Sequence, residues 1–539
     1  MQFYKIHYPS RYFPLFVILT LTFAIFSFSP VSFHKAMVFL GEIVLFFLGV
    51  LFFKRRVIRV SLWMVFCIII GSQVSSIVSS GDYIIPLTLS NLSEFQAVGY
   101  KVVLQSLIII MLYIFFSLFI YKSDYRTSKR HFLLFCLLFI VIDGPVHHLT
   151  RTACQYYKQI SYKPNYNYPE IANKFLKFDF YKAQDLSRYF PNGAPKNIII
   201  LFTEGMSSKV IDSENERDLN VTPNIDSLYE EGLIFKNYFN HTAATFRGLR
   251  GQLNSSYQYR DGVDVKGEGF FQIDNATVSK NYINRLIALP EILNAYDYDS
   301  YFIAATAKHS NLNTLIGTMP FKKVYGMEDF NWHKDDRMSD KKIFTALKEI
   351  VSKQNSTPFF IGVYSSGTHH GMDSPDEKFN NGENIYYNKF YNYDYQLGHF
   401  IDWFKKSSYY KNTLLIITAD HSTFPAPDFK KSFNTTSDYF VDTIPLIMVG
   451  AGVNHQIIDA NGSNSLSLAP TILQILNINY GPNYFLGCSL FDNKCSSKYS
   501  HISVIGEHFY KILKEEDGKY QVTPADSQKD IIDFYNVSG

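Results

Sequence analysis

Four dispersed polar residues carry the side chains that a catalytic metal centre needs. They are Glu204, Thr245, Asp420 and His421. Two carboxylates, one imidazole and one hydroxyl form a donor set suited to a divalent cation, with zinc or manganese the expected ion. A bound cation would lower the pKa of the threonine hydroxyl and make it a usable nucleophile. This grouping predicts a metal-dependent transferase or hydrolase that acts on phosphate-like esters.

Strand-like runs deliver three of these residues to one edge of a predicted sheet. The apolar run Asn197–Thr203 leads directly to Glu204, and the run Asn412–Thr418 leads to Asp420 and His421. The carboxyl ends of parallel strands gather at the edge where the active sites of α/β folds lie. A solvated loop carboxylate is the alternative for Glu204 alone. An Asp-His pair that closes a buried strand favours metal ligation.

The segment HTAATFRGLRGQLNSSY holds the candidate nucleophile. Thr245 precedes a helix-like stretch, where it serves as a helix N-cap or as a catalytic hydroxyl. The two roles are compatible, because a helix N-terminus favours negative charge on a phosphoryl group. Thr242 is the rival nucleophile. Arg247 and Arg250 are predicted to bind an anionic ester, with solvated surface arginines as the alternative.

Histidines follow two further predicted strands at the same sheet edge. His369 and His370 follow Pro358–Tyr364, and His309 follows Tyr301–Ala305. A histidine at this edge can ligate a second metal, donate to phosphoryl oxygens or protonate a leaving group. We predict that His309 and His369 contact the substrate.

Strands alternate with helices from Lys196 onward. The predicted strands are Asn197–Thr203, Leu233–Phe239, Tyr301–Ala305, Pro358–Tyr364, Asn412–Thr418 and Ile444–Val449, and the predicted helices are Pro223–Glu231, residues 388–406 and Ser467–Leu476. This alternation predicts an α/β domain over residues 196–539, with a largely parallel sheet covered on both faces. Residues 151–195, rich in Tyr, Asn, Lys and Pro, are predicted to form a linker.

The first 150 residues contain apolar runs near the length needed to cross a bilayer. These five runs lie at residues 12–29, 36–53, 58–79, 102–121 and 131–147. The sequence therefore predicts a five-helix transmembrane domain over residues 1–150. Basic residues gather between the second and third runs and between the fourth and fifth runs, which places both loops in the cytoplasm. The domain that follows the fifth run is then extracytoplasmic.

Charge and cysteine content set weaker limits. The net charge of +3 over 539 residues is close to neutral, so nothing global indicates a nucleic-acid partner. Cys488 and Cys495 are seven residues apart in the extracytoplasmic domain and can close a small disulfide loop in an oxidising compartment. Spacing alone leaves that disulfide open, because it does not fix the geometry.

The candidate site resembles that of the alkaline phosphatase and sulfatase superfamily, and most of all its membrane-anchored branch of lipoteichoic-acid synthases and phosphoethanolamine transferases. The resemblance rests on KNIIILFTEGMSS, VTPNIDSLYEEGLIFKNYFN, NTLLIITADHS and APTILQILNI. It implies an alkaline-phosphatase-like α/β/α domain in which the four residues bind the metal and Thr245 takes the covalent phospho group. The synthase branch has a similar Asn-Ser…Tyr after its threonine, and Asn254, Ser255 and Tyr257 match it from Thr245 rather than Thr242.

The resemblance also implies a phospholipid donor, an envelope glycan or glycolipid acceptor, and a place in the bacterial inner membrane. His370 looks like the histidine of the transferases' His-Gly-Pro segment, so it is predicted to assist proton transfer. Around Thr245 the chain reads TFRGLR, which lacks the Cys/Ser-x-Pro-x-Arg context that yields formylglycine in sulfatases. The resemblance therefore predicts transfer of a phosphoethanolamine or phosphoglycerol head group through a phospho-threonine.

Two departures leave the head group open. The segment after His309 lacks the Trp-Asn-Arg of glycerol-phosphate polymerases, and the cysteine-rich pattern of lipid A phosphoethanolamine transferases is also missing. An envelope sulfatase or phosphodiesterase is the first alternative function. A catalytically silent structural protein of the envelope is the second.

Overall fold

The chain folds into two compact units, each with its own apolar core. The computed structural model describes residues 12–29, 31–80, 83–84, 100–122, 126–161, 173–181, 185–258, 275–282, 286–506 and 508–538. One unit comprises residues 1–158 and 425–428, and the other comprises residues 159–424 and 429–539.

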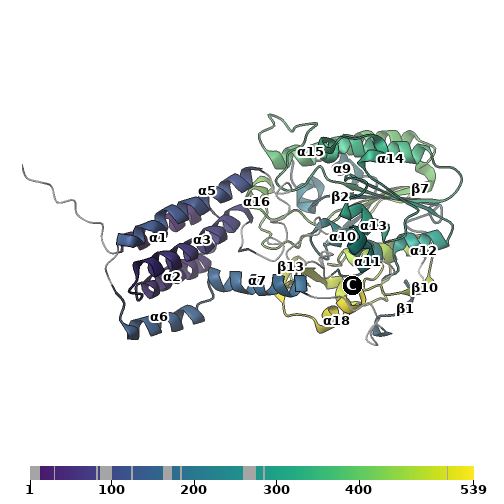
Figure 1. Ribbon diagram of the computed structural model, residues 1–539. Helices are drawn as coiled ribbons and strands as arrows, with labels where there is room; N and C mark the ends of the chain where they lie inside the picture. Colours follow the sequence, from purple (N-terminus) through teal and green to yellow (C-terminus); the bar gives the residue numbers. More distant parts are fainter. Residues whose placement is uncertain are drawn as a thin grey trace, which may run out of the picture. The chain divides into compact units, whose positions relative to one another are not determined.

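The N-terminal unit is helical (Figure 1). Its elements are α1 (Phe13–Phe26), α2 (Phe33–Val50), α3 (Arg56–Ser80), α5 (Tyr100–Ser117), η2 (Leu118–Lys122), α6 (Lys129–Val141) and α7 (Pro145–Ser161). A helix occupies each of the five apolar runs predicted from the sequence. Three helical stretches within the described residues are long and apolar enough to cross a membrane, namely Phe33–Val50, Arg56–Ser79 and Val102–Ile120.

The five crossings predicted from the sequence are therefore shown only in part, since the described residues contain three such helices. Helix α1 has 14 residues and α6 has 13, and at 1.5 Å per residue neither reaches the ~30 Å of a bilayer core. Helix α6 stops before Gly144 and Pro145, because proline cannot continue the hydrogen-bond ladder. Helix α7 then starts at an angle of 57° to α6. Taken as one broken span, this pair brings the candidate crossings among the described residues to four.

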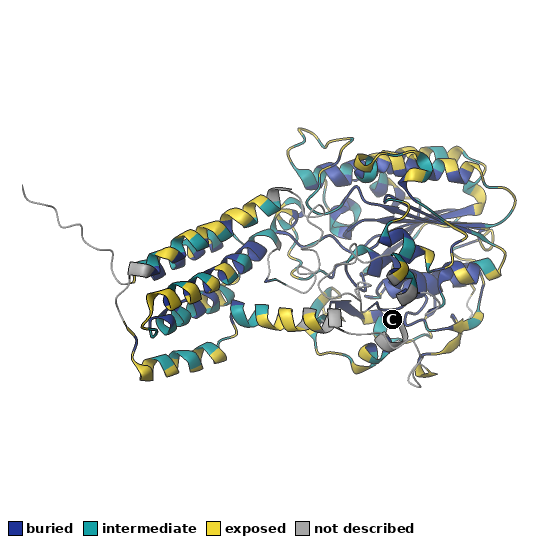
Figure 2. Cartoon of the chain, in the orientation of Figure 1, coloured by how far each residue is buried: buried dark blue, intermediate teal, exposed yellow. Residues whose placement is uncertain are grey.

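The helical unit has an apolar interior and an apolar outer surface. Its core includes Phe39, Phe47, Trp63 and Tyr113, all fully buried. Figure 2 shows exposed positions along α5 and α6, and many of them carry apolar side chains. Exposed side chains there are Leu104, Leu107, Ile108, Met111, Phe115, Leu133, Leu134, Leu137, Ile140 and Val141. Helices that are apolar on every side are typical of a membrane-embedded bundle.

The second unit is built on an eight-stranded sheet. In spatial order its strands are β5 (Lys323–Tyr325), β4 (Asp299–Ala304), β6 (Phe359–Ser365), β2 (Asn197–Thr203), β7 (Thr413–Ala419), β8 (Leu446–Gly450), β3 (Leu233–Lys236) and β9 (Gln456–Asp459). Within this sheet only β8 runs antiparallel to its neighbours, β7 and β3. The largely parallel sheet predicted from the sequence is thus a mixed sheet with one reversed strand.

Helices cover both faces of this sheet, which gives the predicted α/β/α layering. Figure 1 shows α9 (Pro223–Leu228), α14 (Asp340–Ser352) and α15 (Ile385–Lys406) over one face, and α10 (Thr245–Asn254), α12 (Leu289–Ala295) and α13 (Asn311–Gly317) over the other. Strands β2, β6 and β7 are buried at every position, because neither of their faces meets solvent. The remaining helices are α8 (Asp212–Asn215), α11 (Asn275–Tyr282), α16 (Pro427–Phe433), α17 (Leu468–Ile475) and α18 (Lys529–Ser538).

Two smaller sheets lie outside the predicted pattern. Strands β11 (Ile502–Ile505), β12 (His508–Lys514) and β13 (Tyr520–Ala525) form an antiparallel sheet. Strand β1 (Lys177–Asp179) pairs with β10 (Tyr480–Asn483), so part of the predicted linker belongs to the second unit. Residues 162–172 and 182–184 of that linker lie outside the described residues.

A disulfide joins Cys488 to Cys495. The question that the sequence left open is therefore answered in favour of the bridge. It closes the loop that follows β10 and precedes β11.

Candidate functional site

The site begins with the register between β2 and β7. These strands are parallel, and Thr203 pairs with Ala419, so the residues that follow them emerge side by side. The Asp420 amide donates to the Thr203 carbonyl at 3.2 Å. Gly205 has φ +52°, a left-handed conformation that turns the chain away directly after Glu204. The sequence prediction that both strands deliver ligands to one sheet edge is consistent with this register.

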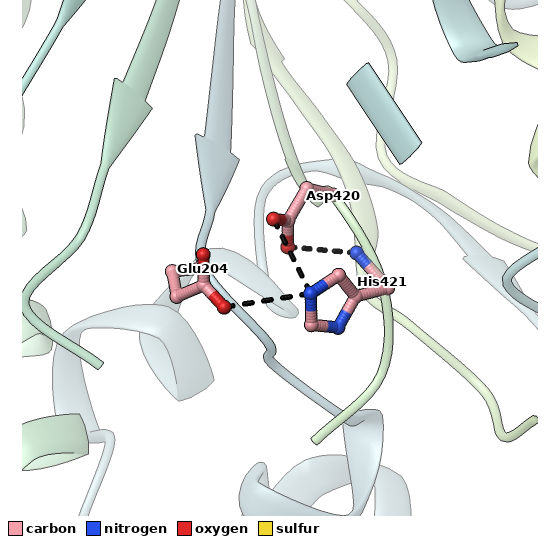
Figure 3. A group of neighbouring side chains, drawn as sticks. All are labelled: Glu204, Asp420 and His421. Atoms are coloured by element: carbon pink, nitrogen blue, oxygen red, sulfur yellow. Dashed lines mark hydrogen bonds and ion pairs between the residues drawn. The ribbon is translucent and has the colours of Figure 1, made fainter. Parts of the chain in front are cut away.

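Glu204, Asp420 and His421 form one cluster (Figure 3). One ligand atom from each lies within 4.8 Å of the others, and all three side chains are buried. His421 Nε2 is 3.4 Å from Glu204 Oε1 and 3.5 Å from Asp420 Oδ2. His421 Nδ1 lies 2.8 Å from the Ser422 carbonyl oxygen, which orients the ring so that Nε2 faces both carboxylates.

Thr245 joins the cluster through its hydroxyl. Its Oγ1 donates to Glu204 Oε2 at 2.7 Å, and the side chain is half-buried at the first position of α10. By contrast, Thr242 donates to the Val504 carbonyl at 2.8 Å and is buried. Of the two candidate nucleophiles, the structure brings Thr245 to the carboxylates.

Close packing against β7 holds the start of α10 at the cluster. A Cβ on Gly248 would lie 2.2 Å from the Asp420 carbonyl oxygen, so glycine permits the helix to approach the strand end. Gln252 donates its amide to the Ala419 carbonyl at 2.9 Å. Ala244, the residue before the helix, has φ +76°, a strained conformation of the kind that accumulates at functional sites.

The electrostatics of the cluster show a surplus of negative charge. Burial opposes a charged His421, but the charges of Asp420 and Glu204 outweigh it and raise its pKa to about 9. Burial, reinforced by the charge of Glu204, raises the pKa of Asp420 to about 7. Burial also opposes ionisation of Glu204, yet its hydrogen bond to His421 holds its pKa well below the usual range. A proton on His421 therefore supplies the positive charge between the two carboxylates.

The donor set fits a divalent cation. Asp420 Oδ2 is buried and accepts no hydrogen bond from the residues that the structure describes. Two carboxylates and an imidazole nitrogen match the preferences of zinc and of manganese. A cation bound here would replace the proton on His421. Glu204, Asp420 and His421 are thus the residues able to hold the metal, with the Thr245 hydroxyl beside them.

The two predicted histidines of the loop after β6 also lie at this edge. The loop is tied to the cluster, because Thr368 Oγ1 donates to the Glu204 carbonyl at 2.5 Å. Burial lowers the pKa of His369, and the charge of Glu204 partly offsets this. Burial, followed by the charge of Lys389, lowers the pKa of His370 to about 3. His370 Nδ1 lies 3.1 Å from the Tyr386 hydroxyl. Because the pKa of each histidine is lowered, both imidazoles are neutral hydrogen-bonding groups near pH 7.

The other predicted substrate-binding residues lie in different surroundings. Arg247 and Arg250 are buried, and the structure gives them partners inside the protein. Arg247 Nε donates to the Ala243 carbonyl at 3.0 Å, and Arg250 donates to the side chain of Gln258. These contacts exclude the alternative of solvated surface arginines, because α10 packs both side chains into the core, and binding of an anionic ester stays a prediction. His309 is exposed and follows β4, which is separated from β2 by β6.

Sequence reasoning missed two groups that touch the site. Tyr364, on β6, donates its hydroxyl to Glu204 Oε2 at 2.5 Å. Lys389, on α15, is fully buried and donates to the His369 carbonyl at 3.2 Å. A strand tyrosine gives no sequence signal, since it is typical of a core. Lys389 does give one, because it lies among buried aromatic residues on one face of α15.

Comparisons with known proteins agree with this geometry. A family model described as Sulfatase matches residues 196–478. The structure is similar to a protein of the alkaline phosphatase superfamily from Vibrio parahaemolyticus, at 19% identity and a TM-score of 0.50, covering 71% of this chain and 92% of that one. It is also similar to the lipoteichoic acid synthase LtaP from Listeria monocytogenes, at 17% identity and a TM-score of 0.50, covering 68% and 94%. At these identities the likeness is one of fold.

Proposed function

The chain belongs to the sulfatase family, and we propose that within it this protein is a phosphotransferase of the cell envelope. It moves a phosphoethanolamine or phosphoglycerol head group from a membrane phospholipid to an envelope glycan or glycolipid. One observation carries the proposal: the half-buried Thr245 hydroxyl donates to Glu204 inside the cluster of metal-ligating side chains. A threonine in this position cannot be converted to formylglycine. The presence of Thr245 therefore favours phospho transfer over sulfate-ester hydrolysis.

The residues of this chain divide the chemistry between them. Glu204, Asp420 and His421 would hold a divalent cation, and a cation bound there would lower the pKa of the Thr245 hydroxyl and offset the charge of the phosphate. Thr245 Oγ1 gives up its proton as it forms a bond to the donor phosphorus, while the bond from phosphorus to the diacylglycerol oxygen breaks and that oxygen takes up the proton that Thr245 gave up. The N-terminus of α10 stabilises the negative charge on the phosphoryl oxygens. The product of this half-reaction is a phospho-threonine.

The second half-reaction regenerates the threonine. An acceptor hydroxyl attacks the phosphorus, its proton passes to a base, and the bond from phosphorus to Thr245 breaks. We assign this base to His370, because its loop is tied to the Glu204 carbonyl through Thr368. His369 is the alternative base. It lies close enough to Glu204 for each group to shift the pKa of the other.

The helical unit supports a lipid donor. Three of its helices are long and apolar enough to cross a membrane. Basic residues lie between α2 and α3 and before α6, at Lys54, Arg55, Arg56, Arg126, Lys129 and Arg130. By the positive-inside rule, α6 then runs outward and residues 159–539 lie outside the cytoplasm. The disulfide between Cys488 and Cys495 suits that compartment.

The test is a single-turnover reaction of the full chain in lipid nanodiscs with a phospholipid labelled in its head group. We expect diacylglycerol release and a phosphorylated Thr245, detected by peptide mass spectrometry. Thr245→Ala should abolish the adduct, and Thr242→Ala, the matched control whose hydroxyl donates to the Val504 carbonyl, should retain it. Release of inorganic sulfate from a sulfate ester, with no threonine adduct from any phospholipid, would overturn the proposal in favour of a hydrolase.

A further inference from the structure

A cavity lies at the elbow between α6 and α7. Its volume is 550 Å³, within the range of small-molecule sites. Residues 139–142 at the end of α6 form its apolar wall, together with Val146. Asp143, His147 and Arg151 form a polar side. The lining is thus amphiphilic, with apolar and charged groups on separate sides.

The elbow that forms this cavity is fixed by buried polar groups of other helices. Glu42, on α2, is fully buried and accepts from the Val146 amide at 3.1 Å. Its other oxygen lies 3.4 Å from His147 Nδ1. Gln73, on α3, donates to the Pro145 carbonyl at 2.8 Å. A Cβ on Gly144 would lie 2.5 Å from Glu42 Oε2, so only glycine fits the turn. The cavity is therefore preformed.

The polar side of the cavity can bind a phosphate. Arg151 is 57% exposed and pairs with Asp143, which is 64% exposed, so its guanidinium lies at the mouth of the cavity. An arginine fork binds phosphate oxygens in a bidentate manner. A phosphate bound to Arg151 would displace Asp143 and leave that carboxylate for an ammonium group. The apolar wall continues onto the exposed Ile140 and Val141, which gives an acyl chain a continuous surface.

We propose that the elbow cavity binds a glycerophospholipid of the outer leaflet, with its phosphate on Arg151 and an acyl chain along residues 139–142. This inference rests on the proposed function for its orientation, in which α6 runs outward and its C-terminal end reaches the outer head-group layer. The bound molecule belongs to the class that the proposed transfer consumes. The elbow is a binding site separate from the cluster of Glu204, Asp420 and His421.

The test uses the full chain in nanodiscs that contain a trace of a phospholipid with a photoreactive acyl chain. Peptide mapping should place the crosslink within residues 139–151. Arg151→Ala should reduce this labelling about fivefold, the effect of one cation on a lipid head group. Arg130→Ala, at the other end of α6, is the matched control and should leave it unchanged. Equal labelling in both variants would identify annular lipid only and overturn the proposal.

Two head groups and a second variant sharpen the experiment. Ethanolamine and glycerol lipids share the phosphodiester, and labelling with either supports the site; a preference for ethanolamine would indicate that Asp143 binds the ammonium. Val141→Trp places a bulky ring in the cavity without touching Arg151, and it should also reduce labelling. Unreduced labelling in this variant would count against the cavity as the site.

The outcomes separate this proposal from the proposed function. Photolabelling needs no catalysis, so Thr245→Ala should label as the natural chain does. Labelling at the elbow without any head-group transfer would overturn the proposed function but would still support the lipid-binding site. If the Arg151→Ala variant transfers head groups with an unchanged KM for bilayer phospholipid, the lipid-binding site is overturned and the proposed function stands. If both hold, that KM rises about fivefold while turnover of a water-soluble phosphodiester is unchanged.

Discussion

Two carboxylate–imidazole pairs in this chain, each with a buried carboxylate, have the same separation and different surroundings. Glu42 Oε1 lies 3.4 Å from His147 Nδ1 in the helical unit, and Glu204 Oε1 lies 3.4 Å from His421 Nε2 in the α/β unit. The second oxygen of Glu42 accepts the Val146 amide, so each of its oxygens has a partner. Glu42 thus holds a backbone turn in place.

The pair at the sheet edge differs because a second carboxylate joins it. Asp420 Oδ2 is buried and, among the described residues, receives no hydrogen bond. Its burial beside Glu204 leaves more negative charge than one imidazole can neutralise. A carboxylate satisfied by backbone amides is a structural element, whereas adjacent carboxylates with an unused acceptor are prepared for a cation. The environment, rather than the residue pair, decides between structure and chemistry.

The largest expected effect comes from removing the surplus charge. Asp420→Asn keeps the size of the side chain but weakens metal binding, so we expect head-group transfer to fall by about 10³-fold or more. Transfer assays together with metal analysis of the purified protein measure both effects. Glu42→Gln, the equivalent change in the other pair, should retain the metal. Wild-type metal content in Asp420→Asn would contradict the distinction drawn between the pairs.

The second prediction tests the structural role of the elbow. Gly144→Ala brings a methyl group against Glu42 and should cost about 2 kcal/mol of stability, as other overpacked cores do. Thermal unfolding in detergent, followed by circular dichroism, gives the measurement. Gly49→Ala is the control, because a Cβ there meets no atom within 4 Å. Equal melting temperatures for the two variants would show that Glu42 does not fix the elbow.

A smaller change is expected from the lysine behind the histidine loop. Lys389→Met removes the donor to the His369 carbonyl, and we expect turnover to fall about 10-fold, as for outer partners of metal sites. Metal content should not change. Lys405→Met, on an exposed part of the same helix, should leave turnover unaltered. A Lys389→Met variant that loses its metal would place this residue in the binding of the cation instead.

The smallest effect concerns another buried carboxylate, Asp340. Asp340 accepts from Asn392 at 2.9 Å, and burial raises its pKa from 3.8 to about 8. Between these values the folded state holds a proton that the unfolded state has lost, so stability falls as pH rises from about 4 to about 8. The slope is on the order of 1 kcal/mol per pH unit at most.

Asp340→Asn should flatten this dependence. Urea unfolding of the full chain at pH 5 and pH 8 measures it, with Asp335→Asn as the exposed control. If the variant keeps the natural pH dependence, Asp340 is ionised in the folded protein. In that case its neighbours stabilise the charge more strongly than its burial opposes it.

The sequence predicted the sheet edge well because continuous apolar runs determine it. Strand β2 has the predicted bounds, and β7 differs by one residue at each end. Strands β12 and β13 were missed, since sequences such as HFYKILK mix charged and apolar residues and their pairing partners are distant in the chain. The described residues contain three or four candidate crossings rather than five, because apolar character predicts membrane affinity but not helix length.

The candidate site was predictable where chemistry follows a strand and unpredictable where it depends on packing. Glu204, Asp420 and His421 were found from their position after two strands, and the structure brings them together. Tyr364 and Lys389 reach the site from a strand and a helix whose sequence patterns are typical of a protein core. Arg247 and Arg250 are not the solvated residues of the alternative interpretation, because α10 buries both of its faces, and their binding of an ester stays a prediction.

The position of strand β1 also determines which proteolytic cuts would release an intact second unit from a membrane. Phe175, just before β1, is buried and stacks edge-on against Phe534 at 5.1 Å. A protease that cuts between residues 158 and 173 would release the second unit with the contact between Phe175 and Phe534 intact. A cut after residue 181 would remove β1, leave β10 as an open edge and expose Phe534 to water. We expect the first cleavage to leave the second unit folded and the second cleavage to leave a fragment prone to aggregation.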